Sequence, residues 1–154
     1  MDIFENVVPV QMAPNDGATT TYALSAGTSD VNSVPIDMQA YQGRAFALQA
    51  ILGTITSTGV GTFKLQHSDA SGSGFTDITG ASVSWTDTDS NKMVGIQVNR
   101  ITKRYIRVAT DRGTANSVIA AMIGLIGGLR KKPATGKFPT GAGAWSAVPS
   151  IIAQ

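Results

Sequence analysis

Apolar and polar residues alternate along four segments of the chain. In residues 44–52 (RAFALQAIL) the apolar side chains of Phe46, Leu48, Ala50 and Leu52 stand at every second position. The same period recurs in residues 62–68 (TFKLQHS), 93–98 (MVGIQV) and 104–110 (RYIRVAT). Because successive side chains of a strand point to opposite faces, each segment is predicted to be a β-strand with one apolar face.

Shorter strands are predicted at residues 19–24, 34–37 and 81–85, and turn-forming residues separate the strands. These turns fall at residues 15–17, 59–61, 69–74 and 87–91, where Gly, Asp, Asn and Ser gather. Residues 64–78 (KLQHSDASGSGFTDI) are predicted to form a hairpin. Many short strands with regular turns indicate an all-β protein, an antiparallel β-sandwich or jelly roll.

Residues 115–129 (ANSVIAAMIGLIGGL) are predicted to form a buried strand. A helix is the alternative, and residues 113–129 carry no charge. A membrane-spanning helix needs about 20 apolar residues, however, and this segment begins with small or polar ones. Its glycines also disfavour a helix.

Both ends of the chain lack this alternation, so three parts are predicted. They are an N-terminal arm (1–17), the β-sandwich domain (18–130) and an extended C-terminal arm (131–154). The arms nevertheless carry apolar side chains that are costly to leave in water: Phe4, Phe138, Trp145, Ile151 and Ile152. We expect the C-terminal arm to bind a neighbouring subunit. For the N-terminal arm, binding a neighbour and folding back on its own domain remain equally open.

Charge is sparse and divided between two parts of the chain. Only 14% of the residues are charged, against about a quarter in a typical globular domain. Residues 1–99 contain nine acidic and three basic residues, whereas residues 100–137 contain nine basic residues and one acidic residue. A molecule with two signs of charge is suited to binding copies of itself or another protein. The basic positions are Arg100, Lys103, Arg104, Arg107, Arg112, Arg130, Lys131, Lys132 and Lys137.

Four of these basic residues are predicted to serve electrostatic contacts with other subunits: Arg100, Lys103, Arg104 and Arg107. Three more, Arg130, Lys131 and Lys132, are predicted to lie at an interface with a neighbouring subunit or another protein. Only Tyr105 lies among them as an aromatic, so a stacking platform for nucleic acid is poorly supported. The sequence therefore predicts protein partners, with nucleic acid as the less favoured possibility.

Candidate chemistry is scarce. The single histidine, His67, is expected to pack near a strand end rather than to act as a base. Residues 87–91 (DTDSN) mimic the start of a calcium loop, but Lys92 and Val98 replace its required Gly and Glu, so a turn is predicted. No catalytic residue, metal site or cofactor is predicted. For a carbohydrate-binding module, which would need exposed aromatic side chains, Trp85 is the one good candidate.

Two stretches of the sequence resemble a known family of virion proteins. Residues 34–78 contain the VPIDMQAY opening and the TFKLQHSDASGSGFTD hairpin, and residues 94–110 contain TKRYIRVAT. These strings resemble the head decoration (cement) proteins of tailed bacteriophages, jelly-roll proteins of podovirus-type capsids. The resemblance covers about residues 34–129 and includes neither arm.

The resemblance implies a structural protein without catalytic residues, made in the host cytoplasm and placed on the capsid surface. It implies that the major capsid protein is the partner, bound by a homodimer or homotrimer. Phage neck or tail proteins share similar strings, so a structural role there is an alternative, as is a β-sandwich module that binds carbohydrate or a host surface.

Overall fold

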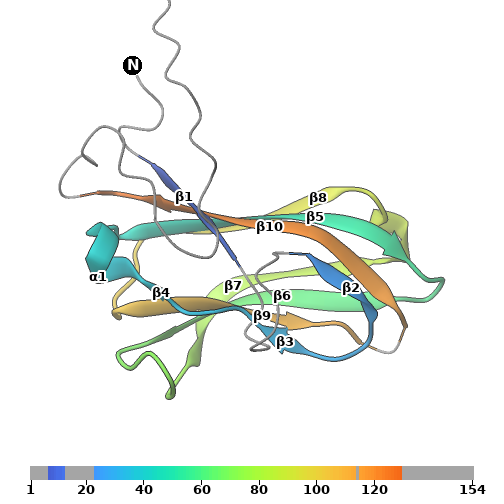
Figure 1. Ribbon diagram of the computed structural model, residues 1–154, viewed down its shortest axis with the longest axis horizontal. Helices are drawn as coiled ribbons and strands as arrows, with labels where there is room; N and C mark the ends of the chain where they lie inside the picture. Colours follow the sequence, from blue (N-terminus) through green and yellow to red (C-terminus); the bar gives the residue numbers. More distant parts are fainter. Residues whose placement is uncertain (1–6, 13–22, 114, 130–154) are drawn as a thin grey trace, which may run out of the picture.

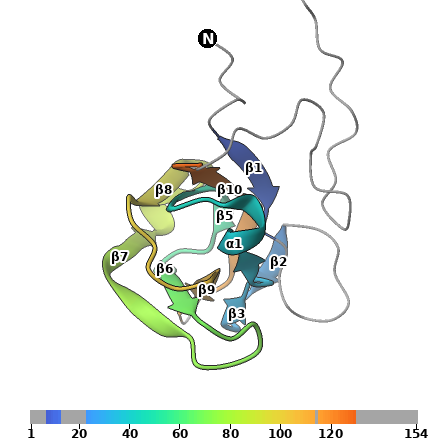
Figure 2. The same ribbon diagram turned by 90° about the vertical axis from the view of Figure 1, so that its left-hand side faces the viewer.

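The fold is a sandwich of two antiparallel β-sheets (Figures 1 and 2). It was obtained as a computed structural model, which describes residues 7–12, 23–113 and 115–129. The first sheet has the order β1–β10–β5–β8, with β2 also on β10. Its strands are β1 (Val8–Gln11), β2 (Leu24–Gly27), β5 (Ala45–Ile55), β8 (Met93–Val98) and β10 (Ser117–Gly127).

The second sheet has the order β3–β9–β6–β7, with β4 also on β9. Its strands are β3 (Val31–Asn32), β4 (Ile36–Asp37), β6 (Val60–Ser68), β7 (Thr76–Thr86) and β9 (Tyr105–Asp111). A short helix, α1 (Met38–Tyr41), follows β4, and a 3₁₀ turn, η2 (Asp87–Asp89), links β7 to β8.

The strand pairs are nested along the chain. The outermost pairing is that of β1 and β2 with β10, then comes β3 and β4 with β9, then β5 with β8, and innermost the hairpin of β6 and β7. Successive pairs alternate between the two sheets, as a long hairpin does when it is rolled into a sandwich. This connectivity is a jelly roll, and it confirms the predicted fold class.

The core lies between the sheets and consists of the alternating apolar residues. Phe46, Leu48, Ala50 and Leu52 of β5 are all buried, and so are Phe63 and Leu65 of β6. On the core side of the second sheet, Trp85 of β7 packs against Phe63 of the neighbouring strand β6, with ring centroids 6.2 Å apart. The period-two segments therefore fold as predicted.

Residues 115–129 contain β10, so the prediction of a strand is confirmed. Ile119, Met122 and Ile126 point into the core, whereas Ile123 and Leu125 on the other face are only half-buried. The second face of this strand is thus more open than the sequence suggested. No helix in the described part of the chain is long and apolar enough to span a membrane.

Three local features differ from the sequence-based expectation. Gly61, taken for a turn residue, lies inside β6 beneath the ring of Trp85. The short helix α1 was not foreseen because four residues show no helical period; Asp37 caps it by accepting a hydrogen bond from the Gln39 amide at 3.0 Å. Of the strand predicted at residues 19–24, only the last residue falls in β2, and residues 19–22 lie outside the described residues.

Within the N-terminal segment, residues 8–11 form β1 and pair with β10. Val8 and Val10 are buried in the core of their own domain. Of the two alternatives for the N-terminal arm, residues 8–11 therefore fold back on their own domain. The anchors named at the ends, Phe4, Phe138, Trp145, Ile151 and Ile152, and the basic residues Arg130, Lys131 and Lys132 lie outside the described residues.

Candidate interaction surface

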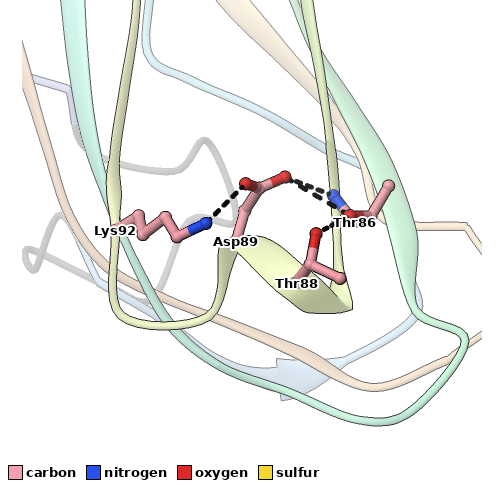
Figure 3. Close-up of polar contacts among 4 residues, drawn as sticks. All are labelled: Thr86, Thr88, Asp89 and Lys92. Atoms are coloured by element: carbon pink, nitrogen blue, oxygen red, sulfur yellow. Dashed lines mark hydrogen bonds and ion pairs between the residues drawn. The ribbon is translucent and has the colours of Figure 1, made fainter.

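Both carboxylates of the turn that mimics a calcium loop accept hydrogen bonds from the protein itself, and Figure 3 shows those of Asp89. Asp89 Oδ2 accepts from the Thr86 amide at 3.0 Å, and Asp89 Oδ1 accepts from Lys92 Nζ at 3.4 Å. Asp87 Oδ2 accepts from the Thr58 amide at 2.9 Å. The hydrogen bond from the Thr86 amide is the main cause that holds the pKa of Asp89 below its usual value. The predicted turn is confirmed.

The described residues contain no group of three or more His, Cys, Asp or Glu side chains arranged to hold a metal ion. His67 stands half-buried near the end of β6, and its Nδ1 atom is buried without a hydrogen-bond partner. Burial, and then the charge of Lys103, lower its pKa. The neighbouring Ser68 donates to the Ser73 carbonyl at 2.6 Å and accepts from the Ala70 amide at 3.0 Å, so this hydroxyl supports the β6–β7 turn.

Trp85 belongs to the core and not to an exposed platform. Only 1% of its surface is exposed. The sequence left this open because Trp85 stands next to a polar turn. Its position in β7 is inward, however, and the proposal that it stacks on sugars is wrong for the folded domain.

The basic residues do not form one patch, because several are engaged separately. Arg104 donates to both carboxylate oxygens of Asp37, with Nη2 2.7 Å from Oδ2, and lies over the Tyr105 ring. The guanidinium of Arg107 lies 4.2 Å above the centre of the Phe75 ring.

The remaining three basic residues differ in burial and partners. Arg112 is buried and donates to backbone carbonyls. Lys103 reaches Thr76 Oγ1 at 3.5 Å. Arg100 is exposed and makes no ion pair with the described residues.

The outer face of the second sheet is mostly polar and hydrogen-bonded across its strands, with one large apolar side chain, Val60, exposed at the start of β6. Gln66 Nε2 donates to Asp77 Oδ1 at 2.7 Å, and Arg107 Nε donates to Gln66 Oε1 at 2.8 Å. The hydroxyls of Thr62 and Ser84 lie 3.1 Å apart. We call this surface the polar face; it is typical of a sheet face turned to water.

The outer face of the first sheet carries no charged side chain among the outward positions of its described strands. We call it the uncharged face. The strand register aligns these positions in three rows across the sheet: Ala121–Ile51–Met93, Gln11–Ile123–Gln49–Gly95 and Pro9–Leu125–Ala47–Gln97.

Two large apolar side chains of the uncharged face are exposed side by side. Ile51 is 43% exposed and Met93 is 64% exposed, and they stand directly opposite each other on β5 and β8. The rows also contain Gln11, Gln49 and Gln97, so the exposed apolar surface of this face is centred on Ile51 and Met93. Adjacent exposed apolar side chains make this face the candidate interaction surface. The sequence shows that the outward positions of each of these strands are uncharged, but only the pairing of the strands brings these positions together on one face.

No protein-family model and no curated protein matches this sequence. Among solved structures, it is similar to the C-terminal family 22 carbohydrate-binding module of Clostridium thermocellum Xyn10B, with 17% identity and a TM-score of 0.45; 83% of this chain and 98% of that chain are covered.

Two further similar structures have lower identity. The Eiger TNF of S. frugiperda has 11% identity and a TM-score of 0.40, covering 84% of this chain and 98% of that one. The C-terminal CBM6 of LamC from Zobellia galactanivorans has 8% identity and a TM-score of 0.39, covering 79% and 99%. At these identities the likeness concerns the β-sandwich alone.

Proposed function

We propose that this chain is a non-catalytic structural protein that binds the surface of an assembled protein shell through its uncharged face. The observation that carries the proposal is the contrast between the two outer faces of the sandwich. The polar face is already satisfied by its own cross-strand hydrogen bonds. The uncharged face exposes Ile51 and Met93 to water, and their burial against a partner is favourable.

Binding an assembled shell in preference to its separated subunits stabilises the shell by mass action. Each contact can be weak, because many copies on one particle act together. The resemblance of residues 34–129 to bacteriophage head decoration proteins supports the capsid surface as the location and the major capsid protein as the partner. A phage neck or tail structure is the alternative location for the same structural role.

Co-sedimentation with shells of the phage that encodes the chain, prepared without this protein, tests the proposal. The variant Ile51→Glu places one charge on the uncharged face. Its matched control, Ser82→Glu, places the same charge on the polar face, at an exposed position opposite Lys64. Ile51→Glu is expected to lower shell occupancy at least about tenfold, because binding would bury an unpaired charge, and Ser82→Glu is expected to bind normally. Equal binding of both variants, or no binding of the native chain, would contradict the proposal.

Carbohydrate binding is the second candidate, since similar solved structures include carbohydrate-binding modules. That likeness extends to the fold and supplies no sugar-contacting residue, and Trp85 is buried. Calorimetric titration of the native chain with soluble xylan and laminarin separates the candidates. Saturable sugar binding together with absent shell binding would replace the first proposal by the second.

A further inference from the structure

The edge strands of this sandwich differ in how they are protected from pairing with another chain. An exposed edge presents unpaired backbone N–H and C=O groups, and proteins protect it with short strands, proline, charge or bulges. Strands β2, β3 and β4 are two to four residues long, and β1 contains Pro9. Strand β7 carries Asp77 and has an irregular register with β6.

Strand β8 has none of these protections. Its six residues, MVGIQV, include no charge and no proline, and its register with β5 is regular throughout. Among the described residues β8 pairs with β5 alone, so its other side is an open edge. Figure 2 places β8 on the side of the sandwich away from β1 and β2. This edge is therefore open to another strand of matching chemistry.

The charges that flank β8 favour a second copy of the same strand. Just before β8, the turn η2 supplies Asp87 and Asp89; Lys92 pairs with Asp89, so the net negative charge at this end comes from Asp87. Just after it come Arg100 and Lys103, neither of which makes an ion pair with the described residues. If two β8 strands pair antiparallel, the acidic end of each meets the basic end of the other, whereas parallel pairing would bring like charges together.

We infer that β8 pairs antiparallel with β8 of a second copy about a two-fold axis, which makes the protein a homodimer with one continuous sheet. A register centred on Gly95 places Met93 opposite the partner's Gln97, on the same outer face. The uncharged faces of the two copies then adjoin along this edge. This pairing does not depend on shell binding. The further statement that the two adjoining uncharged faces bind the shell together rests on the proposed function.

Sedimentation velocity of the full chain over about a hundredfold range of concentration tests the pairing. In the variant Met93→Lys/Gln97→Lys, lysines stand opposite each other at both symmetry-related positions. We expect the dimer dissociation constant to rise about tenfold or more. The matched variant Met93→Glu/Gln97→Lys changes the same two exposed positions but sets opposite charges across the axis, and it is expected to remain dimeric.

A second control separates local repulsion from total charge. Ser71→Lys/Ser73→Lys adds the same charge as the lysine pair, in the exposed turn between β6 and β7. It is expected to dimerise like the native chain. A native chain that stays monomeric or forms trimers would overturn the inference, as would equal dimerisation of both variants at residues 93 and 97.

The same measurement on a chain that ends at Lys132 identifies a competing occupant of the edge. If only this shortened chain dimerised, residues 133–154 would occupy the edge and the inference would be wrong. Shell binding is measured separately, with the native chain and both variants at residues 93 and 97. A dimer that does not bind shells would refute the proposed function and leave the pairing intact.

Discussion

Replacing Gly61 by alanine, which adds a single methyl group, is expected to disrupt the packing of the core. Gly61 lies in β6 and faces inward, between Trp85 of β7 and the backbone of β9. A Cβ atom added there would stand 2.1 Å from Cζ2 of Trp85 and 2.5 Å from the carbonyl oxygen of Asp111. Both separations are far below van der Waals contact, so Gly61→Ala requires something to move.

The stability lost in Gly61→Ala depends on how far the Trp85 ring and the Asp111 carbonyl can move away from the added methyl group. The Trp85 ring is 1% exposed and packs against Phe63, so it has little free space to enter. The Asp111 carbonyl belongs to a strand paired with β6. Overpacking a core costs about 1–3 kcal/mol of stability. Alanine also lowers the conformational entropy of the unfolded chain relative to glycine, and this offsets at most about 1 kcal/mol of that cost. We expect Gly61→Ala to lower the free energy of unfolding by about 2 kcal/mol, a large part of a typical 5–15 kcal/mol.

Urea unfolding followed by far-ultraviolet circular dichroism measures this loss. Gly72→Ala is the control, because a Cβ at that turn position would meet nothing within 4 Å; a change within about 0.5 kcal/mol is expected there. Trp85→Leu removes the ring atoms that collide, so in that background the cost of Gly61→Ala should fall by about 1 kcal/mol or more. Strict additivity of the two changes, or a neutral Gly61→Ala, would refute the packing argument.

Two further predictions concern charged groups. The hydrogen bonds from Arg104 hold the pKa of Asp37 below its ordinary value of 3.8. This pair therefore stabilises the fold above that pH, and its contribution is lost as the pH falls through the lower pKa of the folded state. Because Arg104 is 48% exposed, solvent screens the pair, and Asp37→Asn should lower the free energy of unfolding only slightly at neutral pH. In urea titrations at successively lower pH, the difference from the native chain should shrink as Asp37 becomes protonated. A difference that does not change with pH would count against the ion pair. Arg112→Met should lower the free energy of unfolding by about 3 kcal/mol, since Arg112 is 7% exposed and its guanidinium donates to the carbonyls of Ser25 at 2.6 Å and Ser29 at 2.8 Å. The control, Arg44→Met at an exposed position, should change this free energy by less than about 0.5 kcal/mol. Similar losses in the two variants would show that the buried contacts of Arg112 contribute little.

The alternation of apolar residues was enough to predict the strands and the fold class. Period two is a local property: it depends only on the geometry of an extended chain, so Phe46, Leu48 and Ile106 could be placed in the core without knowing their neighbours. The strand in residues 115–129 was predictable for a related reason, since glycine and β-branched residues disfavour a helix of that length.

The environments of individual side chains were not predictable, because their partners come from distant parts of the chain. Arg107 meets Gln66 across 41 positions and Arg112 meets Ser29 across 83. The basic residues that look like one cluster in the sequence are thereby separated into different contacts. The core positions of Trp85 and Gly61 were unpredictable for the same reason, since the Trp85 ring occupies the space that a side chain at position 61 would need.

The sequence by itself determined that every strand has an inward and an outward side, because alternation along an extended chain requires it. Only the tertiary structure decided which outward sides lie next to one another. Nested pairing sets β1, β10, β5 and β8 in one sheet and so gathers Ile51, Met93 and Leu125 on an uncharged face. The same pairing leaves β8 at an edge, because no strand among the described residues follows it in the sheet.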